Sequence, residues 1–316
     1  MATSTSITTT YAGEFAGKYI SAALLAGNTI ANGGLTVRPN VKFKEVVKRM
    51  ELDGIVKDGT CDFADTSTLT LTERILQPEE FQVNLELCKK DFRSDWEAVS
   101  MGYSAFDNLP SNFQDYLISH VAAKVAQKTE NTIWGGVDAT AGEFDGFATL
   151  LAADANLPSG QEIAGTAITA SNVVEELGKV VDAIPSSLYG REDLHVYVAQ
   201  NVFRAYKRAL GGFAANGLGA NGYMAQGNNQ DINIQFIDGV KVFMANGLSS
   251  NTMVATTKDN LWFGTGLLAD HNEVKILDMA DLDGSQNVRV IMRFTAGVQY
   301  GVVEDIVTYG ITNSAN

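Results

Sequence analysis

The stretch "GLGANG", residues 217–222, has glycines at the three positions of the fingerprint that binds dinucleotide cofactors. In such a site the glycines follow a buried strand and open a helix, whose amides bind the pyrophosphate. Here a segment with helical periodicity, ending at Leu210, precedes them, and "YMAQGNNQ" after them lacks that periodicity. The stretch also belongs to a tract, 211–227, that contains six glycines. The sequence therefore predicts a mobile surface loop that binds no cofactor.

Cys88 is a candidate nucleophile, because Lys89 and Lys90 follow it and nearby cations activate thiols. No histidine is near it in sequence, however, and the alternation of the segment places it among polar neighbours at the end of a strand. We interpret it as a structural thiol. The only other cysteine is Cys61, and two cysteines argue against a disulfide framework and suit a reducing cytoplasm.

The remaining candidates for chemistry also lack the required spacing. His120, His195 and His271 are not spaced as metal ligands, and no metalloprotease, serine-hydrolase or phosphate-loop signature occurs. The stretch "DMADLDG", residues 278–284, gathers three carboxylates but lacks the distal glutamate of a calcium loop, and it suits the tip of a hairpin. The sequence predicts no catalytic residue, no cofactor and no metal.

Composition excludes several classes of protein. The chain has 316 residues, of which 45% are hydrophobic and 19% charged, as in a folded globular protein. Its net charge of −14 leaves no basic face of the kind that binds nucleic acid through its phosphates. No apolar run reaches the roughly 18 residues that span a bilayer. The beginning, "MATSTSITTTYAGEF", lacks the basic start and apolar core of a signal peptide.

Two extended features stand near the N-terminus. Residues 11–30 can form one helix weakened by three glycines, which we interpret as an arm that seeks a partner surface, with a solvated disordered tail as the alternative. Val41–Val47 is a predicted strand. "TLTL" and "FQVNLEL" then alternate with period two on either side of Pro78, and we interpret them as a long, polar, two-stranded excursion. Such a ribbon is marginal in isolation and needs a surface to lie on.

The clearest element is a helix over Ser111–Trp134, whose apolar residues recur at steps of three and four and which Gly135 and Gly136 end. It would be about 36 Å long and would serve as a spine for the whole domain. The pattern further predicts a helix over 172–184, a strand over 194–199 with a helix after it, and a hairpin in "INIQFIDGVKVFM". Further strands are predicted at 253–256, 261–264, 274–277, 288–294 and 298–308.

This order of elements resembles the major capsid proteins of tailed bacteriophages, the Hong Kong 97-type fold shared with encapsulins. "YAGEFAGKYISAAL" resembles the arm of that family, and "VKFKEVV" through "TLTLTERILQPEEFQVNLELCKKDFRSDW" its extended loop. "LPSNFQDYLISHVAAKVAQKTENTIWGG" followed by "FDGFATLL" is similar to the spine helix and the turn after it. "FIDGVKVFMANGL" and "NLWFGTGLLADHNEVKILDM" are similar to the axial-domain hairpins, and "VRVIMRFTAGVQYGVVEDIVTYGI" to the closing strands. The likeness covers almost the whole chain but lies in element order, without one diagnostic motif.

The resemblance implies an α+β fold with six regions. They are an N-terminal arm (1–40), an extended loop with its flanking strands (41–92), a peripheral domain with the spine helix 111–134 (93–165), an axial domain (166–270), a peripheral-domain hairpin (271–296) and C-terminal strands that return to the axial domain (297–316). It also implies a structural protein, not an enzyme, that forms hexamers and pentamers of an icosahedral shell around double-stranded DNA, without sequence-specific DNA binding and without a membrane.

The implied partners are other copies of the chain, a portal and decoration proteins. Many family members carry a helical scaffolding segment before the arm; since the arm comes almost at once here, the resemblance implies a separate scaffolding protein or a mature-length gene product. Assembly is expected in the cytoplasm of a host bacterium, and the protein itself in the virion. An encapsulin shell around an enzyme cargo and a monomeric cytoplasmic enzyme are the alternatives. Candidate inter-subunit contacts are Phe63, Leu69, Leu71, Arg74, Asp281 and Asp283.

Overall fold

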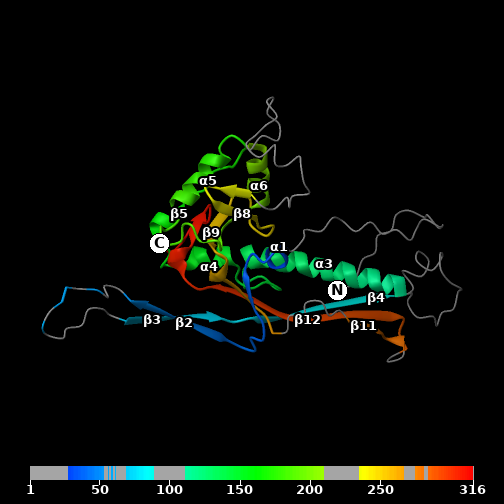
Figure 1. Cartoon of the computed structure of the whole chain (residues 1–316). Helices are drawn as coiled ribbons and strands as arrows, with labels where there is room; N and C mark the ends of the chain where they lie inside the picture. Colours follow the sequence, from blue (N-terminus) through cyan, green and yellow to red (C-terminus); the bar gives the residue numbers. More distant parts are fainter. Residues whose placement is uncertain are drawn as a thin grey trace. The chain divides into compact units, whose positions relative to one another are not determined.

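The computed structural model describes residues 28–52, 56, 58–59, 61, 69–88, 111–209, 235–266, 275–280 and 284–315 (Figure 1). The chain divides into two compact units. Unit 1 comprises residues 1–26, 80–128 and 267–295, and unit 2 comprises residues 27–79, 129–266 and 296–316. Helices and strands are both present, as the predicted α+β class requires.

The core of unit 2 is a six-stranded sheet with the order β5-β13-β9-β6-β8-β7. Its strands are β5 (Glu162–Ile163), β6 (Leu194–Val198), β7 (Gln235–Ile237), β8 (Val240–Met244), β9 (Met253–Thr257) and β13 (Val307–Tyr309). Helices α5 (Val173–Asp182) and α6 (Gln200–Lys207) contact each other, and α5 also contacts β9 and β13 (Figure 1). Every residue of β6 and β9 is buried, as expected of central strands.

The hairpin predicted in this sheet is confirmed. Strands β7 and β8 are joined by Asp238 and Gly239, whose φ angles of 46° and 80° are both left-handed. A two-residue turn with two positive φ angles matches the right-handed twist of the flanking strands, and Asp-Gly is a preferred pair for it.

The predicted spine helix is confirmed as α3 (Ser111–Gly135), whose residues from Thr129 onward belong to unit 2. There the fully buried Trp134 packs against Phe147 of helix α4 (Phe147–Ala153), with ring centroids 5.4 Å apart. A Cβ atom at Gly136 would lie 2.4 Å from the carbonyl oxygen of Phe144, so only glycine allows the chain to fold back this closely after the helix. The segment "FDGFATLL", which was expected to be a turn after the spine helix, contains the start of helix α4.

A buried carboxylate joins α3 to the short helix α1 (Asn28–Ala31). Glu130 accepts hydrogen bonds from the backbone N–H of Thr29, at 3.1 Å, and from the Thr29 hydroxyl. Backbone N–H groups of Asn246 and Gly247 also donate to it, and the Trp134 indole donates to the Thr29 hydroxyl at 2.9 Å. Burial raises the pKa of Glu130 in spite of these donors.

Of the helix predicted over residues 11–30, only residues 28–30 belong to the described part of the chain, and they lie in α1. The rest of that prediction lies outside the described residues.

A five-stranded sheet contains β1 (Thr36–Arg38), which runs parallel to β10 (Leu261–Gly264). β10 in turn pairs with residues 297–300 of β12 (Asn287–Tyr300).

The sequence predicted two separate strands, 288–294 and 298–308, and this was wrong. β12 is one strand that continues through residues 295–297 and ends at Tyr300. Gly297 does not interrupt it but lets Gln77 and Pro78 approach, because a Cβ atom there would lie 2.8 Å from the carbonyl oxygen of Gln77.

Unit 1 contains most of β4 (Glu79–Cys88), β11 (Lys275–Asp278) and the first part of β12. β12 pairs with both of the others, and Phe81 of β4 lies 5.6 Å from Phe294 between ring centroids. Arg289 and Arg293 are both exposed on one face of β12, while Val288, Val290 and Met292 between and beside them are buried.

The two alternating segments around Pro78 are not the two strands of one ribbon, and this corrects the sequence interpretation. The first is β3 (Leu69–Leu76), which pairs with β2 (Glu45–Leu52), and the second is β4, which pairs with β12. The strand predicted at Val41–Val47 is likewise displaced to β2. Proline has no N–H with which to continue a ladder, so the pairing partner changes at Gln77–Pro78.

Candidate assembly interface

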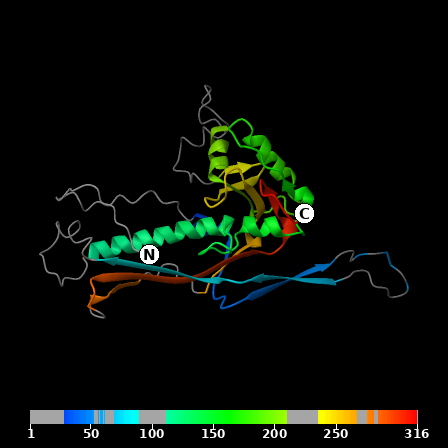
Figure 2. The same cartoon turned by 180° about the vertical axis from the view of Figure 1, so that it is seen from behind.

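Strands β2 and β3 form a two-stranded antiparallel ribbon, the blue and cyan strands that lie side by side in Figures 1 and 2. Eight residue pairs run from Glu45 opposite Leu76 to Leu52 opposite Leu69. Residues directly opposite each other in such a pair share a face. One face therefore carries most of the apolar side chains of the ribbon, and we call it the apolar face. Its described apolar members are Val46, Met50, Leu69, Leu71 and Ile75.

The apolar face is exposed within the chain. Its five apolar side chains keep between 41% and 63% of their surface accessible to solvent. One charged pair, Lys48 opposite Glu73, interrupts the stripe. An exposed apolar stripe of this kind is a candidate surface for contact with another macromolecule.

The opposite face of the ribbon packs on the body of unit 2 at its root. Leu76 is fully buried with Val41 and Trp262, and Val47 packs against this cluster. A Cβ atom at Gly264 would lie 2.9 Å from a Leu76 methyl carbon, so this glycine makes room for the leucine. The root of the ribbon is thus part of the hydrophobic core.

Arg74 projects from this same packed face to a buried carboxylate. Its guanidinium bonds Asp154 Oδ2 at 2.6 Å and lies 4.9 Å from the centre of the Tyr300 ring, while the Tyr300 hydroxyl donates to Asp154 at 2.7 Å. Burial alone would raise the pKa of Asp154. The hydrogen bonds from Tyr300, the backbone N–H of Asn156 and Arg74, with the charge of Arg74, outweigh it and hold that pKa below its ordinary value.

We expect the stability of the chain to depend on pH through Asp154. Its pKa is lower in the folded chain than in the unfolded one, so its contribution is fully present above the ordinary pKa of 3.8 and is lost as the pH falls through the folded value. Asp154→Asn should lower the free energy of unfolding by roughly 1–3 kcal/mol at pH 7 and by less near pH 3. Urea unfolding at both pH values checks this; an equal loss at both would contradict it.

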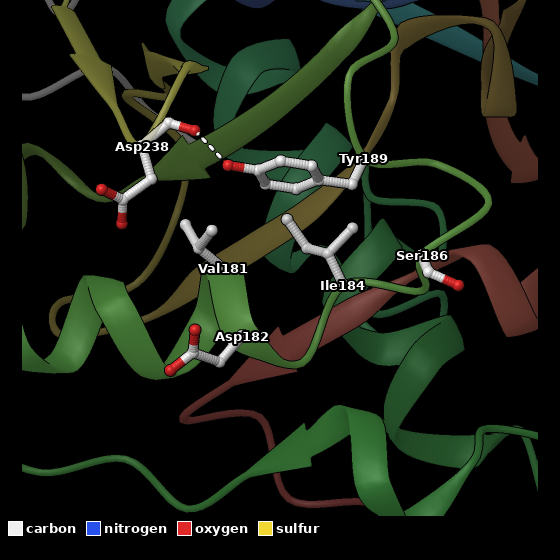
Figure 3. A pocket seen from close by; sticks show the side chains of 6 residues that line it. All are labelled: Val181, Asp182, Ile184, Ser186, Tyr189 and Asp238. Carbon is white, nitrogen blue, oxygen red and sulfur yellow. Dashed lines mark hydrogen bonds between the residues drawn. The ribbon is translucent and has the colours of Figure 1, made fainter.

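A hollow of about 410 Å³ lies between the end of α5 and the β7–β8 turn (Figure 3). Val181, Asp182, Ile184, Ser186, Tyr189 and Asp238 line it, and the Tyr189 hydroxyl donates to the backbone oxygen of Asp238 at 2.6 Å. Among the described residues that line it there is no histidine, cysteine or lysine.

The other residues considered as candidates for catalysis or metal binding are the histidine in β6 and the two cysteines. His195 is buried in β6, stacks on Tyr197 and bonds the backbone oxygen of Asp193 at 2.7 Å, and burial lowers its pKa. Cys61 and Cys88 are free thiols. Within the part of the chain that the structure describes, no cluster of His, Cys, Asp or Glu is placed to hold a metal ion. No helix of these residues is long and apolar enough to cross a membrane.

The predicted inter-subunit contacts fall into three groups. Leu69 and Leu71 lie on the exposed apolar face, and Arg74 lies on the packed face in an ion pair with its own chain. Phe63, Asp281 and Asp283 lie outside the described residues, as do "GLGANG" and His271. As contacts between subunits all six stay predictions.

Sequence reasoning missed three residues of the apolar face, Val46, Met50 and Ile75. The alternation in "EVVKRMEL" signals that Val46 and Met50 share a face, but only the register of β2 against β3 places them beside Leu71 and Ile75.

No family model and no curated protein matches the chain. Several solved structures do match it. The capsid of a native GTA particle is 13% identical with a TM-score of 0.62, and the match covers 93% of each chain. A chain of Mycobacterium phage Adephagia is 15% identical with a TM-score of 0.58, over 92% of this chain and 91% of that one. The capsid of Myoviridae phage XM1 is 11% identical with a TM-score of 0.56, over 92% and 94%. The chain therefore has the fold of the tailed-phage capsid proteins, as the resemblance predicted.

Proposed function

We propose that this chain is the structural subunit of a tailed-bacteriophage capsid, and that copies of it assemble as hexamers and pentamers into a closed icosahedral shell around double-stranded DNA. The observation that carries the proposal is the exposed apolar face of the ribbon. The capsid fold supports it independently, because the structures that share this fold over nine-tenths of the chain include capsids.

The energetics of the ribbon favour a partner. Burying the exposed half of each leucine- or methionine-sized side chain of the apolar face contributes about 1 kcal/mol, and a shell repeats the contact at every subunit. A two-stranded ribbon that covers no such surface is marginally stable. We propose that the apolar face lies on an adjacent copy of the chain.

The acidity of the chain fits the enclosed genome. A net charge of −14 disfavours tight binding to phosphates, so the packaged DNA would stay free to enter and leave. A portal, a scaffolding protein and decoration proteins are proposed partners, and the virion, assembled in the host cytoplasm, is the proposed location.

Assembly is tested with the purified full chain, alone and with proteins encoded next to it. Analytical ultracentrifugation and negative-stain electron microscopy should show closed, uniform particles. A stable monomer at high concentration under both conditions would contradict the proposal. Particles that enclose a protein cargo and exclude DNA would establish an encapsulin-like shell instead.

A further inference from the structure

The hollow beside the end of α5 has an apolar floor, an aromatic wall and an acidic side. Figure 3 shows the side chains of Val181 and Ile184 pointing toward the ring of Tyr189. The carboxylates of Asp182 and Asp238 lie at one side of them, and both aspartates are exposed. Tyr189 keeps 53% of its surface accessible to solvent. A cation with an apolar stem would meet a complementary surface here, because an aromatic face and carboxylates both attract positive charge.

The basic residues beside the hollow, on α5 and after Tyr189, are engaged with other carboxylates. The Lys179 ammonium lies 2.9 Å from Glu176 and 3.3 Å from Glu175. The Arg191 guanidinium bonds both carboxylate oxygens of Asp193 at 2.9 Å. Among the described residues that line the hollow there is neither arginine nor lysine. The end of a helix also carries the negative end of its dipole, so this position favours a cation that comes from elsewhere.

Helix α6 carries an exposed basic face. Its buried residues are Val202, Phe203, Ala205 and Tyr206. Arg204 and the C-cap residue Arg208 are both exposed and stand four positions apart, so they lie on one face, which we call the arginine face. Within the described part of the chain, neither guanidinium is paired with a carboxylate.

The charge of the chain favours contact between these two surfaces. At a net charge of −14, copies of the chain repel one another, so association costs least where an acidic surface meets a basic one. The hollow and the arginine face both belong to unit 2, and every copy presents both. Because they are different surfaces, contact between them is head-to-tail, and such a contact closes into a ring when the rotation from copy to copy fits.

We propose that the hollow receives the arginine face of an adjacent copy of the chain. A guanidinium of that face stacks on the ring of Tyr189, and its stem lies on Val181 and Ile184. Asp182 and Asp238 accept its hydrogen bonds. This inference rests on the proposed function, since it names the residues that join neighbouring copies within a hexamer or pentamer.

The pairing is tested by exchanging the charges. Asp182→Lys with Asp238→Asn makes the hollow basic, and asparagine tolerates the left-handed backbone that Asp238 has in the β7–β8 turn. Arg204→Glu with Arg208→Gln makes the arginine face acidic. Each of these two chains should need a subunit concentration about tenfold higher to form particles, because like charges then meet. The chain with all four substitutions keeps the natural net charge and should return to within about threefold of the natural concentration.

Asp138→Lys with Asp145→Asn is the matched control for the hollow, because it makes the same change in charge on the loop between α3 and α4. It should form particles as the natural chain does, and the melting temperature of each chain separates failure to fold from failure to associate. Natural particle formation by either charge variant would overturn the inference. So would a lack of recovery in the chain with all four substitutions, which would indicate a basic partner other than a second copy.

The proximity of the two surfaces is measured independently by cross-linking. Cys61 and Cys88 are replaced by serine, and a short bismaleimide joins Ser186→Cys in the hollow to Arg208→Cys on α6. The chain with both new cysteines should give a ladder of covalent oligomers beyond the dimer, whereas a chain with either one alone should stop at the dimer. Particles without the ladder would overturn the inference and leave the proposed function standing. The ladder without closed particles would remove the proposed function and leave the contact standing.

Discussion

A chain with Met50→Glu and Leu71→Lys should fold normally and fail to assemble. The two residues lie directly opposite each other at the centre of the apolar face, so the substitutions remove its apolar character. They also place opposite charges across the two strands, which keeps the pairing of the ribbon favourable. Because about three-fifths of each side chain is left to bury, losing both costs about 2–4 kcal/mol at each contact, which amounts to at least roughly thirtyfold in the association constant.

The measurement is the yield of closed particles by ultracentrifugation, with the melting temperature as a check of folding. Lys48→Glu with Glu73→Lys is the matched control, because it reverses the charged pair on the same face and removes no apolar side chain. This control should assemble. Normal particle yield from the Met50→Glu, Leu71→Lys chain would show that the apolar face is outside the interface.

The second large effect is expected in folding, from Glu130→Ala. The substitution removes the acceptor of the Thr29 N–H and hydroxyl and of the Gly247 N–H, while the Asn246 N–H keeps Asn28 Oδ1 as an acceptor. Each buried donor left without an acceptor costs about 1–3 kcal/mol, so the free energy of unfolding should fall by at least about 3 kcal/mol. α1 should loosen at Thr29 but keep the hydrogen bonds that join Asn28 to Met244 and Asn246.

Urea unfolding followed by circular dichroism gives this difference. Glu130→Gln is the matched control, since its carbonyl oxygen keeps part of the acceptor capacity at nearly the same volume, and it should lose markedly less stability than Glu130→Ala. A Glu130→Ala chain within about 1 kcal/mol of the natural one would mean that water satisfies these donors in its place.

Local periodicity was sufficient for the elements that bury one stripe or one face. The apolar steps of α3, the alternation of β4 and the Asp-Gly turn between β7 and β8 each contain their own signal, and each prediction is confirmed. Strand pairing has no such local signal. β3 pairs with β2 and β4 pairs with β12, more than 200 residues away in sequence, so the partners depend on tertiary contacts that alternation does not specify.

The same limit applies to the candidate interface. Leu69 and Leu71 were predicted because "TLTL" shows that they share a face, whereas Met50 joins them only through the register of the ribbon. The partner of Arg74 is Asp154, 80 residues further along the chain, and nothing near either residue in sequence indicates the other. An arginine in an alternating strand is expected to be a surface residue. That Arg74 attaches the root of the ribbon to the body follows only from the fold.

Amide hydrogen exchange of the ribbon, in free subunits and in assembled shells, tests the central claim most directly. The root, residues 45–49 and 72–76, packs on its own body and should be protected in both states. The outer pairs, residues 50–52 and 69–71, should exchange rapidly in the free subunit and become strongly protected in the shell, because ordering them requires the neighbouring copy. Strong protection of these outer residues already in a free monomer would show that the ribbon needs no partner and would contradict the account.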